Sequence, residues 1–121
     1  METVSIEEIN HTGGPELIHS LIPQRAPFLF IDNIKFRDEK TIKTTYKVTG
    51  KEAFFEGHFP GHPIMPGVLL CEACFQSGAA LLARGEDKSL RVVTKVQQTR
   101  FKKLVTPGDL FKILKRCKIA F

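Results

Sequence analysis

The chain has 121 residues, 42% of them hydrophobic, which suits one packed domain. No stretch approaches the roughly 18 apolar residues of a membrane span, and the N-terminus lacks a basic stretch before an apolar core. The sequence thus predicts neither a membrane helix nor a secretory signal, and the cytosol is the expected location. The formal net charge is +5, and residues 91–121 hold nine Lys or Arg against one acid. Such a flank predicts an acidic partner (nucleic acid, anionic lipid or acidic protein) or a merely solvated face.

The N-terminal segment predicts a loose extension followed by a short helix. Residues 1–14 are polar and end in two glycines. Apolar residues at helical spacing then predict a helix over residues 15–22. Pro15 suits a first-turn position, and Pro23 cannot continue the helix.

Four segments have the composition or alternation of β-strands. They are residues 28–36, 42–49, 90–105 and 110–121. A polar turn over 37–40 joins the first two into an expected hairpin, and a turn over 106–109, with Pro107 and Gly108, joins the last two.

A helix rich in apolar residues is predicted at the centre of the chain. Over residues 67–84, twelve of eighteen residues are Ala, Val, Leu, Cys or Phe, spread around the helix, and Gly85 suits a left-handed stop. A helix that is apolar all round is a buried helix, and Glu72 and Gln76 form one narrow polar line on it. The expected fold class is α+β, with an antiparallel sheet wrapped over this central helix.

The loop before this helix and one carboxylate within it suggest acid–base chemistry. Residues 57–67 contain three glycines and three prolines, more than a simple connector needs, and they carry His58. Glu72 has mostly apolar helical neighbours, and burial would raise its pKa. A histidine and a protonated carboxyl supply one base and one acid. Gly67 leaves its backbone N–H open toward an anion or a polarised carbonyl at the helix N-terminus.

Metal and redox sites are less well supported alternatives. The pairs His58-x3-His62 and Cys71-x2-Cys74 have the spacing of zinc ligands. The two cysteines lie inside a continuous helix, however, whereas metal-binding pairs of this spacing usually lie on a tight turn. Cys71 is also past the first turn, where a thioredoxin-like pair would begin. With Cys117 the cysteine count is odd, so reduced, buried thiols are expected.

The central motif resembles one family. The segment Gly57-His58-Phe59-Pro60-Gly61-x-Pro63-x-Met65-Pro66-Gly67-Val68-Leu69-x-x-Glu72-Ala73-x-x-Gln76 is similar to the signature of the (3R)-hydroxyacyl-acyl-carrier-protein dehydratases of bacterial type II fatty-acid synthesis. The segments over 22–32 and 100–109 also resemble this family, so that the resemblance covers about residues 17–113.

The resemblance implies a single hotdog domain that forms homodimers, in some members assembled into hexamers. It implies that His58 and Glu72 are the catalytic pair, contributed by opposite subunits, and that no metal or redox cofactor is needed. Substrate contacts are implied for the Gly67 N–H, the Ile64 carbonyl that orients His58, the Gln76 side chain that holds Glu72, and Phe59. The implied partner is acyl carrier protein, whose phosphopantetheine arm carries the substrate and which would dock on the basic residues Arg100, Lys102 and Lys103.

The chain departs from the family pattern at three places. Gln24 stands where the family usually has histidine, and Val92 or Val93 stands near an aromatic gate that some members have. The family continues with a further strand after the one beginning at Leu110, so a truncated or naturally short chain is expected. Three other functions stay open: a hotdog thioesterase, a non-catalytic acyl-carrier-binding module, and a nucleic-acid binder. The basic flank lacks the interleaved aromatic residues that would favour the last.

Overall fold

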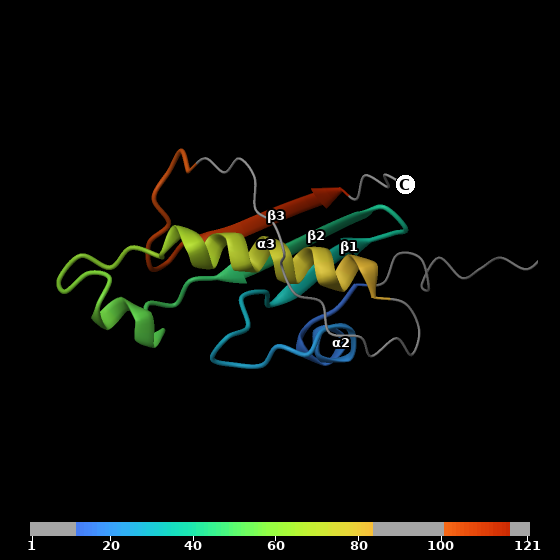
Figure 1. The fold of residues 1–121 in the computed structure, drawn as a ribbon, viewed down its shortest axis with the longest axis horizontal. Helices are drawn as coiled ribbons and strands as arrows, with labels where there is room; N and C mark the ends of the chain where they lie inside the picture. Colours follow the sequence, from blue (N-terminus) through green and yellow to red (C-terminus); the bar gives the residue numbers. More distant parts are fainter. Residues whose placement is uncertain (1–11, 84–100, 117–121) are drawn as a thin grey trace, which may run out of the picture.

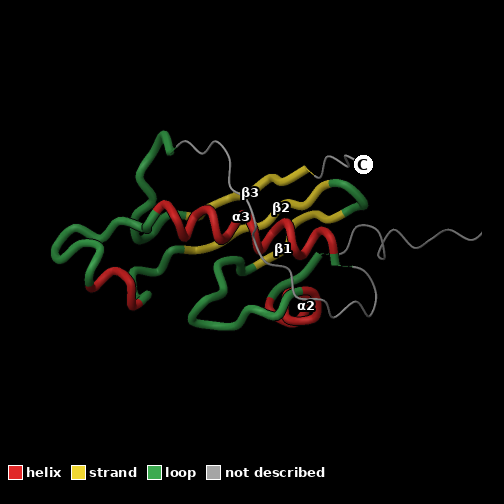
Figure 2. Tube along the Cα trace, in the orientation of Figure 1, coloured by secondary structure: helices red, strands yellow, loops and turns green. Residues whose placement is uncertain are grey.

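The computed structural model describes residues 12–83 and 101–116. In these ranges the elements are α2 (Pro15–Leu21), β1 (Asn33–Arg37), β2 (Thr41–Lys47), the 3-10 helix η1 (Ala53–Glu56), α3 (Gly67–Leu82) and β3 (Leu110–Arg116). The strands form an antiparallel sheet in the order β1-β2-β3. Helix α3 lies along one face of this sheet, and α2 lies beside β1 (Figures 1 and 2). The predicted α+β arrangement of an antiparallel sheet on a central helix is therefore present.

The predicted hairpin of β1 and β2 is confirmed, but its boundaries differ from the prediction. Strand β1 begins at Asn33 rather than at residue 28. Arg37, predicted in the turn, is the last residue of the strand. The turn follows at Asp38, whose carboxylate accepts hydrogen bonds from the backbone N–H groups of Lys40 and Thr41 at 2.9 and 2.7 Å. A side chain that bonds the backbone two or three residues on is a strong turn former.

Strand β3 pairs with β2 from Leu110 to Arg116, and residues 117–121 of the predicted strand lie outside the described residues. The predicted turn is present: Asp109 N–H donates to the Thr106 carbonyl at 3.1 Å, and Gly108 has a φ of +98°. Of the strand predicted over 90–105, residues 90–100 are not described, and residues 101–105 are not in a strand. There the Val105 carbonyl accepts from the Met65 N–H at 2.7 Å, which ties this segment to the start of α3.

Helix α3 is buried on one face only, so the prediction of burial all round is wrong for the single chain. Val68 is 75% exposed and Leu82 is 47% exposed. The buried face consists of Leu70, Ala73, Gln76, Ser77, Ala80 and Leu81. None of the helices within the described ranges is long and apolar enough to cross a membrane.

The C-terminus of α3 is capped by an arginine of the sheet. The helix ends at Leu82, two residues before the predicted end, and Ala83 is extended. The buried Arg37 guanidinium donates to the carbonyls of Ala80 (3.0 Å) and Ala83. A cation bonded to the last carbonyls of a helix satisfies them and complements the helix dipole. Gly85, where the sequence predicts a left-handed stop, lies outside the described residues.

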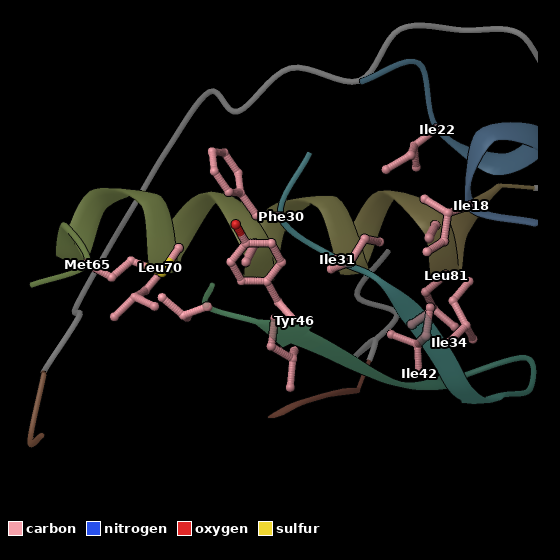
Figure 3. Packing of buried hydrophobic residues seen from close by; sticks show 14 of the residues in the cluster. Ile18, Ile22, Phe30, Ile31, Ile34, Ile42, Tyr46, Met65, Leu70 and Leu81 are labelled. Carbon is pink, nitrogen blue, oxygen red and sulfur yellow. The ribbon is translucent and has the colours of Figure 1, made fainter. Parts of the chain in front are cut away.

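The core fills the space between α3, α2 and the sheet (Figure 3). A pair of hydroxyl groups is buried within it. Ser77 on α3 donates to the Ala73 carbonyl at 2.9 Å and is 2.8 Å from the Thr44 hydroxyl on β2, so Thr44 donates to Ser77. Ser77 is fully buried and Thr44 is 1% exposed, so the contact satisfies the Thr44 hydroxyl where water does not reach it.

The expected loose extension over residues 1–14 is anchored at its end. Gly13 and Ile34 exchange two backbone hydrogen bonds, at 3.1 and 2.7 Å. Residues 1–11 lie outside the described ranges. The helix predicted over 15–22 is confirmed as α2, with Pro15 in its first turn, and its fully buried Ile18 packs in the core.

Candidate active site

The Gly/Pro-rich loop between η1 and α3 has a fixed backbone path. The Phe54 carbonyl accepts from the His58 N–H at 3.1 Å, which extends the last turn of η1. Phe59 and His62 then exchange backbone hydrogen bonds of 2.9 and 2.8 Å, and between them Gly61 has a φ of +78°. A positive φ at this point favours glycine. The loop extends beyond the end of the sheet, on the side where α3 begins (Figure 1).

His58 is held by the loop in a defined tautomer. Its Nδ1 is 2.8 Å from the Ile64 carbonyl, and the Ile64 N–H donates to the His58 carbonyl at 3.1 Å. Because a carbonyl can only accept, Nδ1 carries the proton, and in the neutral ring Nε2 has a free lone pair. The Phe59 ring stacks on the imidazole with centroids 4.0 Å apart. The contact expected between Ile64 and His58 is thus present, and it leaves Nε2 as a base.

Gln76 connects Glu72 to the segment before β1. Its Oε1 accepts from the Phe30 N–H at 2.8 Å, and its Nε2 donates to the Phe28 carbonyl at 2.9 Å and to the Glu72 carboxylate at 3.0 Å. Gln76 is 1% exposed, whereas Glu72 is only partly buried. The full burial expected of Glu72 is therefore not found in the single chain. These bonds also explain why the segment around Phe30 is not in the sheet: the Phe30 N–H bonds to Gln76 instead.

Gly67 opens α3, and an aromatic ring lies against it. The N–H of Gly67 has no hydrogen-bond partner within residues 12–83 and 101–116. A Cβ at this position would lie 2.9 Å from two ring atoms of Phe101. The sequence predicts an open approach to Gly67, but the ring of Phe101 occupies one side of it. The glycine is needed here for this close packing as well as for any contact with a substrate.

Aromatic side chains pack around the segment that Gln76 holds. Phe30 makes edge contacts with Phe28 (5.1 Å between centroids) and with Tyr46 (5.9 Å). Burial, reinforced by the charges of Glu52 and Asp32, raises the pKa of Tyr46 to about 12. Sequence reasoning did not find this cluster, because Tyr46 comes from a segment separate from that of Phe28 and Phe30.

A cavity of about 640 Å³ lies beside α3, between residues 101–105 and the start of β3. Its apolar lining includes Leu70, Phe101, Leu104, Leu110 and Phe111. The exposed side chains of Lys102 and Lys103 also line it, while Arg100 lies outside the described residues.

The described histidines and cysteines are not arranged as a metal site. Among the described residues, no three or more His, Cys, Asp or Glu side chains are grouped so as to hold a metal ion. Cys71 and Cys74 are free and partly buried, and His58 Nδ1 is occupied by the Ile64 carbonyl. In the same part of the chain, no hydrogen bond joins His58 to Glu72, and each has its own partner.

An antiparallel sheet packed on a central helix, with a histidine in the preceding loop and a carboxylate on the helix, is the arrangement expected of a hotdog domain. Residues 22–116 match the family model of the FabA-like domain. The chain therefore belongs to the FabA-like family, and both the hotdog fold and the resemblance to its dehydratases are confirmed.

Similar proteins are found among curated dehydratases. The 3-hydroxyacyl-[acyl-carrier-protein] dehydratase FabZ of Petrotoga mobilis is 42% identical over 95 residues, which cover 78% of this chain and 68% of that protein. The enzyme of the same name from Ralstonia nicotianae is 46% identical over 99 residues, which cover 76% of this chain and 60% of that protein. The bifunctional enzyme LpxC/FabZ of Chlorobaculum tepidum is 42% identical over 100 residues, and this chain spans 21% of its length.

Proposed function

We propose that this protein dehydrates (3R)-3-hydroxyacyl chains carried on acyl carrier protein to the trans-2-enoyl thioesters of fatty-acid biosynthesis. The observation that carries the proposal is the tautomer of His58. With Nδ1–H donated to Ile64, Nε2 is free to remove a proton from C2 of the substrate. The relatives named above supply the substrate class, because they are 3-hydroxyacyl-[acyl-carrier-protein] dehydratases.

The remaining groups have complementary roles in the proposed reaction. Removal of the C2 proton places negative charge on the thioester oxygen, and the Gly67 N–H at the start of α3 stabilises it. Glu72, held by Gln76, gives a proton to the C3 hydroxyl, which leaves as water. Phe59, stacked on His58, lies where it can contact the substrate. These proton transfers need no metal or redox cofactor.

We propose that two copies of the chain complete each site, as a homodimer or as a hexamer of three dimers. Two observations support this. The loop that carries His58 extends beyond the sheet, and within the described part of one chain no hydrogen bond joins His58 to Glu72 (Figure 1). An exposed Val68 next to Gly67 adds an apolar side chain that a second copy could cover.

The experiment is to follow enoyl formation and thiol release together, using 3-hydroxyacyl thioesters of graded chain length. His58→Ala and Glu72→Gln are expected to lower the rate of dehydration by about 10²–10⁴. His62→Ala is the matched control, because His62 is an exposed histidine on the same loop. Near-native turnover by a folded His58→Ala protein would refute the mechanism, and release of free thiol would instead indicate a thioesterase.

Docking of the acidic carrier on Lys102 and Lys103 is the second part of the proposal. Both lysines are exposed and line the cavity beside α3. Charge reversal at either is expected to raise the KM for a carrier-linked substrate and leave a small thioester unaffected. Lys51→Glu, at an exposed lysine elsewhere, is the control. Because exposed charges are screened beyond about 8 Å at physiological ionic strength, only the carrier-linked reaction should weaken with salt. Equal changes in KM and an equal dependence on salt for the two substrates would refute carrier docking at these lysines.

A further inference from the structure

Two thiols of α3 have no role in the proposed dehydration. Cys71 and Cys74 are three residues apart, so they lie on neighbouring positions of one helix face. Both are free, and both line the cavity beside α3. Neither His58 nor Glu72 is among the residues that line it. The cavity therefore combines two nucleophilic groups with an open space that the acid–base pair does not line.

The lining of this cavity favours a ligand with an alkyl chain. Five of its side chains, listed above, are Leu or Phe. Such side chains favour burial of apolar groups in any orientation. Lys102, Lys103 and Asp109 also line the cavity, so its charged groups carry both signs. The thiolate is the nucleophilic form of a cysteine. An apolar space that holds two thiols suits a hydrophobic electrophile.

The two thiols are not equivalent. Burial raises the pKa of the Cys74 thiol, and the opposing charge of Lys115 only reduces this effect. A thiol with a raised pKa has less thiolate at neutral pH and reacts more slowly. Of the two thiols in the cavity, Cys71 is therefore the better candidate for a reaction.

We propose that Cys71 captures alkyl α,β-unsaturated carbonyl compounds that bind in this cavity. The thiolate adds to the β-carbon, so that a carbon–sulfur bond forms as the carbon–carbon π bond breaks. The π electrons pass to the carbonyl as an enolate, which takes a proton from water at the α-carbon. No oxidant or reductant is required. The capture does not depend on the proposed dehydration, although an enoyl product of that reaction would belong to the same chemical class.

The test compares methyl vinyl ketone with octyl vinyl ketone on the full chain carrying C117S, which removes the third cysteine. Intact-mass measurement gives the rate of adduct formation, and peptide mass gives its position. Glutathione, treated alongside, corrects for the intrinsic reactivity of each ketone. The corrected rate is expected to be on the order of 10–100-fold higher for the octyl compound, because part of its chain is buried before reaction. The adduct is expected at Cys71, and C71S should abolish the chain-length effect while C74S preserves it.

A matched pair of leucines tests whether this cavity is the binding site. Leu110 lines it, whereas Leu114 on the same strand does not, and the two are 50% and 58% exposed. Leu110→Asn should reduce the chain-length effect, and Leu114→Asn should leave it unchanged. Equal corrected rates for both ketones on the C117S protein would overturn the proposal, whatever the leucine variants do. Faster modification of Cys74 than of Cys71 would overturn it as well.

Discussion

Replacing Gln76 by leucine should both destabilise the fold and release the carboxylate of Glu72. The substitution introduces an apolar side chain of similar size and removes three hydrogen bonds, to the Phe30 N–H, the Phe28 carbonyl and the Glu72 carboxylate. These bonds tie together two segments more than forty residues apart in the sequence. Loss of the bonds to Phe30 and Phe28 should therefore lower stability, and loss of the bond to Glu72 should also lower the rate of dehydration.

The three bonds contribute unequally, because their partners differ in exposure. Phe30 is 2% exposed, so its N–H would be left without water, at a cost of about 1–3 kcal/mol. Phe28 is 49% exposed, and its carbonyl can bind water instead, with little loss. The partly exposed Glu72 loses a bond worth about 1 kcal/mol. The expected loss of unfolding free energy is therefore about 2–4 kcal/mol.

Urea unfolding monitored by circular dichroism measures this loss, and the dehydration rate measures the catalytic effect. We expect kcat to fall by about 5-fold or more, because one hydrogen bond of about 1 kcal/mol no longer positions the acid. Ser20→Ala is the control: its exposed hydroxyl bonds the Leu17 carbonyl at 2.6 Å, and its removal should change stability by no more than about 0.5 kcal/mol. Gln76→Leu with an unchanged unfolding midpoint would refute the reasoning.

Three further predictions concern other parts of the fold. Tyr46 is the only tyrosine and there is no tryptophan, so tyrosinate absorbance should show its pKa raised to about 12 in the folded protein. Because the fold favours the neutral phenol, stability should fall as the pH rises from about 10 toward 12, and Tyr46→Phe should remove this fall; a native midpoint near 10 would contradict it. Gly67→Ala should cost about 1–3 kcal/mol in urea unfolding, since its Cβ would meet the Phe101 ring at 2.9 Å, and adding Phe101→Ala should recover part of it; an additive double variant would contradict the contact. Arg37→Met should lower the unfolding free energy by about 2–4 kcal/mol because two helix-terminal carbonyls lose their donor, and an unchanged midpoint would show that the cap is dispensable.

The central loop and helix could be predicted because their signals are local. Glycine and proline restrict the backbone wherever they occur, so the path from Gly57 to Gly67 is specified within eleven residues. The Ile64 contact that fixes the His58 tautomer also lies within this loop. The two strands of the hairpin alternate in polarity, which is again a local pattern.

The missed features depend on partners that are distant in the sequence. The apolar run before Asn33 has strand composition, but the Phe30 N–H bonds to Gln76, forty-six residues away. Arg37 has the polarity of a turn residue, but its guanidinium donates to the carbonyl of Ala83, forty-six residues further on, at the end of α3. Ser77 is a buried polar residue of α3, and its partner Thr44 lies thirty-three residues earlier in the sequence. No periodicity in the sequence records such pairings.

The buried hydroxyl pair of Thr44 and Ser77 fixes the angular setting of α3 on the sheet. Apolar contacts are non-directional, so leucines and alanines alone would accept several rotations of the helix about its axis. A slip of one residue turns a helix by about 100°, which would move the Ser77 hydroxyl away from Thr44 and leave the buried Thr44 hydroxyl without this partner. The same slip would swing Gln76 more than a quarter turn from the Phe30 N–H and the Phe28 carbonyl, and would carry Glu72 on the same helix with it. One hydroxyl contact in the core thus sets the rotation of the helix about its axis, and with it the direction of a carboxylate more than one helical turn away.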